Sequence, residues 1–537
     1  MPFYTKIIRK LICLCCFTVM FSTQAHAQLM QSLTIGSPKA LALANAVTAT
    51  PTGIDSIHYN PAGLSHYKNR NIHLKVLVGV FDIQAQFGDY FDEAELAGFV
   101  NFEDDTIPNT ESQTSTPAIM LPGVGVVKPP FLGFPLGGMM VNKPGSPFTF
   151  GTSVYSPAGF GYAREADDPA RYQGQTVAMV RLTYFSPSFG MEVSDTLSIG
   201  ASLGFSWQGM GMEMAMRSPH ILLAGIEALG NQLCPDGATE AGRCASLGDP
   251  VGTFEDAGFL SAEMEDAMSL SFNLGAMWDV TPWLSLGFVY QSEGKADLEG
   301  DFKLEYSEAW YSYWQRQTGA LSQLSFMPEG HEVESGKIKT TMIQSQHASI
   351  GMSLRVTPSI TINADLKWTD TGSWDEFKFE FDTPIDIVKL AGLIQPEEAP
   401  DPYTLILPRG YVSTTSWALG MEYQWDEELT LRVGVEDRPS GIPDDRQDAL
   451  MPVADTYLYG AGFAYQWDSD TLLELGLGYF KSKADVPANT SYNANYTGYQ
   501  EGKPLELATM LYNPYAGISF KTQVTAYLLS FSYLSKF

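Results

Sequence analysis

Positive charge is scarce in this sequence, and so are long apolar runs. Lysine and arginine number 32 against 61 aspartates and glutamates, which gives a formal net charge of -29 at pH 7. So acidic a chain argues against nucleic acid as a partner, because phosphate recognition requires basic surface. After residue 27, no stretch is apolar for long enough to form a transmembrane helix, and no long helical pattern appears. This excludes an α-helical membrane protein.

Reactive and metal-binding residue types are also few. The seven histidines are scattered, and the chain has neither an H-E-x-x-H motif nor a phosphate loop. Three of the five cysteines lie in the first 27 residues. The remaining two, Cys234 and Cys244, predict one disulfide in a stretch rich in Pro, Gly and Asp. No metal, no cofactor and no catalytic residue are therefore predicted.

The first 27 residues have the three parts of a secretory signal peptide. Two lysines and an arginine precede an apolar core at residues 11–21, which is too short to span a bilayer. Ala25-His26-Ala27 then forms an A-x-A cleavage site before Gln28. The sequence therefore predicts export, with a mature chain that begins at Gln28.

The rest of the chain is dominated by alternating apolar and polar residues. Residues 197–207 carry Leu, Ile, Ala, Leu, Phe and Trp on one face and only serine and glycine on the other, and residues 360–369 alternate in a similar way. A period of two indicates β-strands. Five short turns separate such segments, as is typical of hairpins. They lie at residues 193–198, 280–285, 356–361, 425–430 and 467–472.

The length of these segments distinguishes two fold classes. A soluble β-sandwich also alternates, but its strands are about five or six residues long. Alternating strands of about ten to twenty residues fit a barrel with lipid outside and a polar interior. Trp278, Trp283, Trp425 and Trp467 lie at the short turns, where they would form an aromatic girdle, and the last strand ends in Phe537. The sequence therefore predicts an all-β, antiparallel transmembrane barrel.

An even number of strands suits a closed single-chain barrel, and fourteen are predicted. They lie near residues 72–86, 117–128, 147–157, 176–193, 196–214, 269–280, 283–302, 340–356, 358–381, 411–425, 428–438, 454–468, 471–482 and 521–537. The predicted units are the signal peptide (1–27), an N-terminal segment (28–70) and the barrel (71–537). Long outer loops are predicted at residues 215–268, 303–339, 382–410 and 483–520.

The N-terminal segment contains a stretch, residues 33–66, that is rich in Ala, Gly, Thr and Ser. It is too polar for a membrane helix and too apolar for a solvated linker. Asn60, Pro61, Ala62 and Gly63 mark a tight turn, because Pro fixes φ and Gly permits positive φ. Since small side chains let a backbone lie close to another surface, we predict that this segment plugs the barrel as a hatch. A helix-plus-turn unit in an ordinary core is the alternative.

Two outer loops are apolar where those of a diffusion porin would be polar. Residues 221–229 form an apolar helix candidate, and the next loop carries Trp310, Trp314 and Phe326. These residues favour a landing surface for a hydrophobic ligand. Packing of the loops on one another explains each residue equally well.

Basic residues that face the lumen are few. By alternation Arg355, Lys367 and Arg432 point inward. Arg181 lies near a lumen face, but the alternation slips between Tyr184 and Pro187, so its direction is not assigned. One of these basic residues could bind a ligand carboxylate through a charge-assisted hydrogen bond. Ion pairs with lumen carboxylates such as Asp365 or Glu436 are the alternative.

Four stretches carry a resemblance to a known family. They are the Ala/Gly-rich N-terminus that ends in Asn60-Pro61-Ala62-Gly63-Leu64, the segment V-Y-S-P-A-G-F-G at residues 154–161, the segment D-T-L-S-I-G-A at residues 195–201, and residues 418–463 with Pro443-Asp444 and Pro452. In this order and spacing they resemble the FadL/TodX family of outer-membrane transporters of long-chain fatty acids and other hydrophobic compounds.

The resemblance implies a 14-stranded barrel with a hatch in the outer membrane of a Gram-negative bacterium. It implies passive transport of fatty acids or hydrocarbons by capture in outer loops, hatch movement and lateral exit through the wall. A kinked third strand would open that exit, and Pro157 and Gly159 are the nearest candidates. Membrane lipid, lipopolysaccharide and the outer-membrane assembly machinery are the other partners that this resemblance implies.

Three alternative functions remain at this point. A porin for polar solutes would have no reason for the apolar loops or the hatch. An outer-membrane barrel lipase would need a nucleophile, and the G-x-S-x-G match at residues 200–204 lies inside an alternating strand rather than at a strand-turn-helix elbow. A purely structural or adhesive barrel is the third.

The first prediction concerns processing and location. The mature protein should begin at Gln28 and fractionate with the outer membrane. Because closed barrels resist unfolding in detergent, the unheated protein should migrate faster on a gel than the boiled protein. N-terminal sequencing and paired gels test this, and equal mobility or recovery in the soluble periplasm would refute it.

Overall fold

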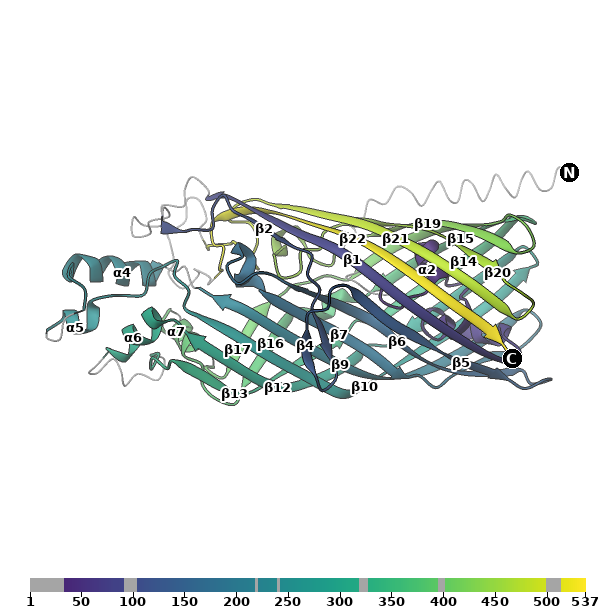
Figure 1. The fold of residues 1–537 in the computed structure, drawn as a ribbon, viewed down its shortest axis with the longest axis horizontal. Coiled ribbons are helices and arrows are strands. Elements are labelled where there is room, and N and C mark those ends of the chain that lie inside the picture. Colours follow the sequence, from purple (N-terminus) through teal and green to yellow (C-terminus); the bar gives the residue numbers. More distant parts are fainter. Residues whose placement is uncertain are drawn as a thin grey trace.

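The computed structural model describes residues 33–90, 104–217, 221–238, 242–317, 327–394, 401–498 and 513–537. These residues form a closed antiparallel β-barrel of 14 strands, which confirms the predicted fold (Figure 1). The first strand, β1 (Arg70–Tyr90), pairs with the last, β22 (Ile518–Lys536), from Asn71 opposite Lys536 to Tyr90 opposite Ile518. No helix within the described ranges is long and apolar enough to cross a bilayer.

The other barrel strands lie between β1 and β22, and several of them consist of two consecutive segments. Between β1 and β22 they are, in chain order, β5 (Leu132–Asn142), β6 (Phe148–Ala163), β7 (Thr176–Phe185) with β8 (Ser188–Glu192), β9 (Leu197–Met216), β10 (Gly258–Thr281), β11 (Leu284–Gln291) with β12 (Gly294–Tyr306), β13 (Val333–Gln344) with β14 (His347–Thr357), β15 (Ile360–Thr369) with β16 (Glu376–Phe381), β17 (Thr404–Pro408) with β18 (Thr414–Gln424), β19 (Leu429–Arg438), β20 (Thr456–Gln466) and β21 (Thr471–Val486).

The predicted second strand, at residues 117–128, is wrong. That segment forms a separate hairpin of β3 (Ile119–Leu121) and β4 (Gly125–Val127), and β5 takes its place beside β1. β5 contains Pro135 and three glycines, which weaken its alternation and are uncommon inside strands. A short strand, β2 (Glu111–Thr114), precedes the hairpin in the chain and pairs with the outer part of β1.

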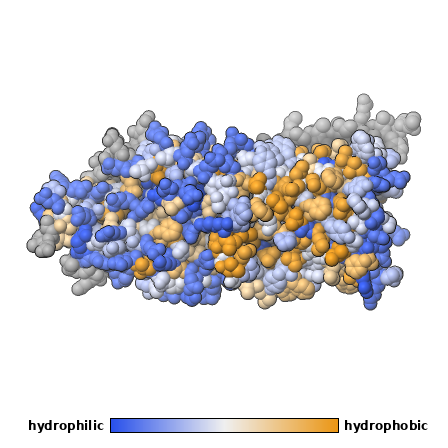
Figure 2. Space-filling model, in the orientation of Figure 1, coloured by the Kyte–Doolittle hydropathy of each residue, from blue (hydrophilic) through white to orange (hydrophobic). Residues whose placement is uncertain are grey.

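The outer surface divides into an apolar band and a polar half. Figure 2 shows apolar residues gathered over the half of the barrel that carries the short turns and the C-terminus, with hydrophilic residues over the other half. The four turn tryptophans are all exposed, as an aromatic girdle requires. In the polar half, outward positions carry ion pairs such as Lys339–Glu299 and Lys337–Asp301.

These ion pairs explain a second difference from the predicted boundaries. β10, β12, β13, β17, β21 and β22 all extend into the ranges predicted as outer loops. Charged outward residues resemble loop sequence, but here they continue the sheet beyond the apolar band. The true loops are shorter than 215–268, 303–339, 382–410 and 483–520.

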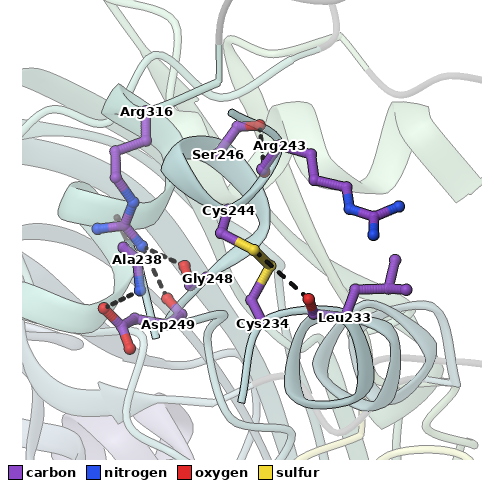
Figure 3. The surroundings of a disulfide bond; sticks show 9 residues. All are labelled: Leu233, Cys234, Ala238, Arg243, Cys244, Ser246, Gly248, Asp249 and Arg316. Carbon is purple, nitrogen blue, oxygen red and sulfur yellow. Dashed lines mark hydrogen bonds between the residues drawn. A yellow bond between two sulfur atoms is a disulfide. The ribbon is translucent and has the colours of Figure 1, made fainter. Parts of the chain in front are cut away.

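Where the structure describes the outer loops, they carry four helices, α4 (Ile221–Leu233), α5 (Cys244–Leu247), α6 (Glu308–Gln315) and α7 (Asp386–Ile394). A disulfide joins Cys234, just after α4, to Cys244 at the start of α5 (Figure 3). The Arg316 guanidinium donates hydrogen bonds to the carbonyls of Gly248 and Asp249, both at 2.8 Å. The disulfide-bonded loop is therefore tied to the loop that carries α6.

The N-terminal segment lies inside the barrel. It consists of α2 (Pro38–Ala42), the 3-10 turn η2 (Gly53–Asp55), α3 (Ser56–Tyr59) and the 3-10 helix η3 (Pro61–His66), and nearly all of its residues are buried. At this level most strands present glycine toward the lumen, where an added Cβ would overlap or crowd the hatch. These glycines are Gly190, Gly200, Gly275, Gly287, Gly351, Gly420, Gly434, Gly460 and Gly476. We call them the glycine ring.

Buried carboxylates of the wall bind the polar groups of the hatch. Asp365 accepts hydrogen bonds from the backbone N–H groups of Val47 and Thr48, each at 2.9 Å, and from the Thr48 hydroxyl at 2.7 Å. The Asn45 amide donates to Glu436 at 2.8 Å. The Asn60 amide donates to the carbonyls of Thr48 and Ala276, while its oxygen caps η3. The predicted turn motif therefore fastens the hatch to β10.

The second prediction tests this close packing. A Cβ at Gly434 would overlap the backbone of Leu43, and the rigid wall gives the hatch little room to shift. Gly434→Leu should therefore unseat the hatch and raise conductance in planar bilayers, at an overpacking cost of about 1–3 kcal/mol.

The matched control is Gly225→Ala in α4, where an added Cβ meets no atom within 4 Å. It should leave conductance at the parent value. Unchanged conductance of a correctly folded Gly434→Leu protein would show that the hatch does not depend on the ring.

Candidate functional site

The barrel wall is interrupted on one side of β6. The ladder between β5 and β6 ends at Val154, so among the described residues the rest of β6 has no partner on that side except one bridge between Ala163 and Thr116. On its other side, the register with β7 shifts between Tyr155 and Ala158. Pro157, which lacks an N–H, lies within this shift, and Gly159 follows it. The two residues predicted at a lateral opening therefore lie where the wall is broken.

An apolar cavity passes through this break. Its lining includes inward residues of β22, β1 and β5, the start of the hatch, the broken part of β6, and outward-facing Val80 of β1. Val80 is 55% exposed on the outer surface. Thr34 supplies the single polar side chain of the lining, and its hydroxyl donates to the Ser156 carbonyl at 2.9 Å. The cavity can therefore accept only a hydrophobic group without a desolvation cost.

A second cavity lies on the lumen side of the same break and shares Gly159, Phe160 and Val180 with the first. Its walls include Met179, Met342, Met451 and Trp374. Methionines are flexible and polarizable, which suits a pocket for hydrocarbon chains of variable shape.

Arg181 is the one charged residue that lines this second cavity. Its side chain is 2% exposed, and it donates to the Gln208 amide oxygen at 3.1 Å. Its second terminal nitrogen, Nη2, has no hydrogen-bond partner among the described residues. A buried guanidinium with an unused donor is a ready site for a carboxylate.

The other predicted basic residues do not lie at these cavities. The Lys367 ammonium pairs with Glu436 at 2.7 Å, and Arg432 pairs with Glu474 at 2.6 Å and Glu422 at 3.0 Å, all beneath the hatch. Arg355 is exposed near the end of β14, at a short turn. For Lys367 and Arg432 the structure shows the ion-pair alternative, with Glu436 as one of the partners.

The two tryptophans of the predicted landing surface are not exposed, whereas Leu229 of α4 is. Trp310 and Trp314 of α6 are buried, and Trp310 stacks on Tyr306 with ring centroids 5.7 Å apart. The loops therefore pack on one another, which was the alternative interpretation. Phe326 lies outside the described residues.

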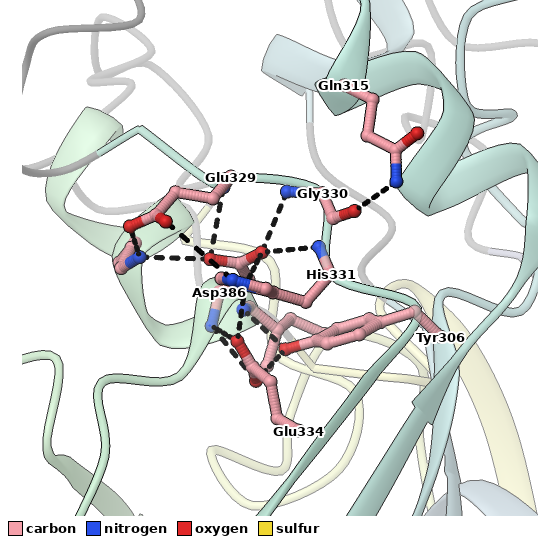
Figure 4. A network of polar contacts seen from close by, with 9 residues as sticks. Tyr306, Gln315, Glu329, Gly330, His331, Glu334 and Asp386 are labelled. Atoms are coloured by element: carbon pink, nitrogen blue, oxygen red, sulfur yellow. Dashed lines mark hydrogen bonds and ion pairs between the residues drawn. The ribbon is translucent and has the colours of Figure 1, made fainter.

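A polar network clamps the α6 and α7 loops together (Figure 4). The buried Asp386 carboxylate accepts backbone N–H groups of Glu329, Gly330 and His331 at 2.9–3.2 Å and pairs with Lys389 at 3.0 Å. Burial alone would raise the pKa of the Asp386 carboxyl, but these donors and the Lys389 ammonium bring the pKa below its usual value. Its stabilising effect is therefore present at neutral pH and is lost only as the pH falls through that lowered pKa.

This network also contains a set of potential metal ligands. Atoms of His331, Glu334 and Asp386 lie within 4.8 Å of one another. The Lys389 ammonium already neutralises Asp386, and Glu334 already accepts the Tyr306 hydroxyl at 2.7 Å and the Asp386 backbone N–H at 3.1 Å. These contacts are enough to hold the two loops together as a structural clamp, without a bound cation.

Sequence reasoning placed the break but left the role of Arg181 open. The alternation of the fourth strand slips at the boundary of β7 and β8, so the direction of Arg181 could not be assigned from the sequence. The slip itself was the available signal, because wall irregularities gather around sites. No such irregularity in the sequence indicates that the β3–β4 hairpin lies outside the barrel. That position follows only once β5 is recognised as the strand beside β1.

Comparison with protein families gives one match over most of the chain. Residues 16–537 match the family model described as outer membrane protein transport protein (OMPP1/FadL/TodX). Among curated proteins, none matches the sequence.

Several solved structures share the fold at low sequence identity. A Pseudomonas aeruginosa FadL homologue is 16% identical, covers 96% of this chain and 100% of its own, and has a TM-score of 0.65. The P. putida toluene transporter TodX is 15% identical with a TM-score of 0.59, covering 94% of this chain and 99% of its own. The Ralstonia pickettii toluene transporter TbuX is 14% identical with a TM-score of 0.57 and the same coverage of both chains.

Proposed function

The chain belongs to the OMPP1/FadL/TodX family of outer-membrane transport proteins, and from this premise we propose that it transports long-chain fatty acids by lateral exit through the barrel wall. The family consists of outer-membrane channels for hydrophobic compounds rather than enzymes. The ligand, its position and its route in this chain belong to the proposal.

The observation that carries the choice of ligand is the Arg181 guanidinium in an apolar, methionine-lined cavity. A hydrocarbon tail gains about 25 cal/mol per Å² on leaving water for such a pocket. A carboxylate head would use the Nη2 donors, which have no partner among the described residues. An amphipathic acid therefore complements both parts of the cavity at once.

The hatch supports a lateral rather than an axial route. It fills the lumen against the glycine ring, and Asp365 and Glu436 hold its backbone and side chains. The apolar cavity at β6, by contrast, shares Gly159, Phe160 and Val180 with the inner cavity and also has outward-facing Val80 in its lining, which supports a route through the wall. Nothing in the sequence resembles a nucleotide site, so the ligand gradient would set the direction of transport.

Aromatic hydrocarbons are the second candidate. The cavity through the wall has a single polar side chain, and two of the solved structures of similar fold are described as toluene transporters. A hydrocarbon would leave Arg181 unused, so this residue distinguishes the two candidates. Membrane lipid, lipopolysaccharide and, through the exposed Phe537, the assembly machinery remain proposed partners.

The third prediction tests the ligand class. Arg181→Gln should weaken binding of a long-chain fatty acid to the purified protein by roughly 10- to 100-fold, because a charge-assisted hydrogen bond contributes about 1.5–3 kcal/mol. Toluene binding should stay unchanged. Arg355→Gln is the matched control, since Arg355 lines neither cavity. If fatty acid binding falls equally in both variants, or falls in neither of them, the assignment of Arg181 is wrong.

The fourth prediction tests the route. Gly159→Trp places a large side chain where the two cavities meet, and an added Cβ there meets only Thr34 at 3.4 Å and Ser156 at 3.8 Å. Uptake into proteoliposomes should fall while equilibrium binding at the inner cavity persists. Gly225→Trp on α4 controls for the bulk of the new residue. Parent rates of uptake for both fatty acids and toluene in a folded Gly159→Trp barrel would rule out the lateral route.

A further inference from the structure

The β3–β4 hairpin lies against the outer face of the barrel rather than within its wall. Its apolar residues form a small core with the outward side of β6, β7 and β9. Ile119 and Met120 of the hairpin are buried there with Ala178, Val180 and Trp207. This core is separate from those inside the barrel. We call residues 115–131 the flap.

Glycines in the wall make room for the flap. Gly161 of β6 and Gly209 and Gly211 of β9 face outward, where barrel strands in the membrane usually carry large apolar residues. A Cβ at Gly211 would overlap the side chain of Val126, and one at Gly161 would overlap the carbonyl of Ala118. The outer wall is therefore hollowed to receive this hairpin.

The polar attachment of the flap is slight. The backbone N–H of Val126 donates to Glu263 at 3.1 Å, and that of Gly123 donates to Glu265 at 3.4 Å. The Lys128 ammonium forms a partly exposed ion pair with Glu213 of β9 at 3.5 Å. One bridge, between Thr116 and Ala163, joins its base to the barrel ladder. Elements with few backbone bonds to the rest of a fold open at lower free energy than those in a continuous ladder.

The flap lies at the mouth of the cavity through the wall. Ala118 and Ile119 line that cavity together with Val80 and Phe134. The flap is also at the edge of the apolar band, since outward residues of β10 change from Glu263 and Glu265 to exposed apolar residues such as Leu270. Its own Val124 is 69% exposed.

From this position we propose that the flap is an external gate, which swings away from β9 and β10 to let ligand leave the wall cavity at the membrane interface. This inference rests on the proposed lateral transport. Opening of the hairpin separates Ile119 from Val80 of β1 and Phe134 of β5 and so lets ligand leave the wall cavity. Its glycine seat and its contacts with three carboxylates, Glu213, Glu263 and Glu265, hold it closed between passages.

A reversible disulfide tests the gate. An added Cβ at Gly211 lies 3.6 Å from the Cβ of Val126, within the range of about 3.5–4.5 Å that a disulfide requires. In Val126→Cys/Gly211→Cys, oxidation should lower the uptake of labelled oleate into proteoliposomes several-fold, and reduction should restore it. Oleate binding in detergent should be the same in both forms. Recovery on reduction shows that the barrel is folded.

The matched control is Glu299→Cys/Lys339→Cys, a pair opposite one another on β12 and β13 and outward-facing like the flap seat. Its oxidation should leave uptake unchanged, as should treatment of the parent protein, whose Cys234 and Cys244 are bonded to each other. Equal uptake by the cross-linked and reduced flap variant would overturn the gate and leave the lateral route standing. A parent protein that takes up neither oleate nor toluene would overturn the proposed function and the gate with it.

A second variant acts in the opposite direction. Glu263→Ala/Glu265→Ala removes the acceptors of both backbone hydrogen bonds that the flap donates to β10, and uptake should rise above the parent rate with oleate binding unchanged. Glu299→Ala, on the same outer face, is its control. Uptake at or below the parent rate in the double variant would contradict a gate held by these contacts.

Discussion

Close packing of the hatch backbone against inward-facing glycines determines much of this structure. A barrel of this size has room for an aqueous channel, and here a short segment of small residues occupies it. Glycine on successive strands removes the side chains that would otherwise keep the hatch away from the wall. Buried carboxylates then satisfy the hatch N–H groups, which would be costly to leave unpaired. A lumen closed in this way favours the wall as the route for cargo.

A route through the wall requires a break in a structure whose stability depends on continuous pairing. Backbone groups without partners are costly in a membrane, and serine hydroxyls reduce that cost here. Ser186 accepts the N–H of Ser153 at 2.9 Å and donates to its carbonyl at 2.8 Å, while Ser156 donates to the Arg181 carbonyl at 2.9 Å. Short polar side chains thus satisfy backbone groups next to the break, where the register of β6 with β7 shifts. The apolar lining of the cavity can then remain free of polar groups other than Thr34.

The sequence predicted the fold because alternation is a local property that each strand shows by itself. The prediction was wrong at β5, where Pro135 and glycines interrupt the period of two. The residues of the flap alternate more regularly and were predicted as the strand instead. Lumen orientation was predictable for Lys367 and Arg432, but their partners were not all predictable, because Glu474 comes from a strand far along the chain. The burial of Trp310 likewise depends on Tyr306 and neighbouring loops, which no local pattern reveals.

On the proposed function, the two cavities impose an order on the passage of an acid. An ionised carboxylate is costly in apolar surroundings, whereas a hydrocarbon tail is not. The inner cavity offers Arg181 to the head, and the wall cavity offers almost entirely apolar surface to the tail. The tail therefore enters the break first while the head stays paired with the guanidinium. Release of the head comes last, once the tail lies in the wall.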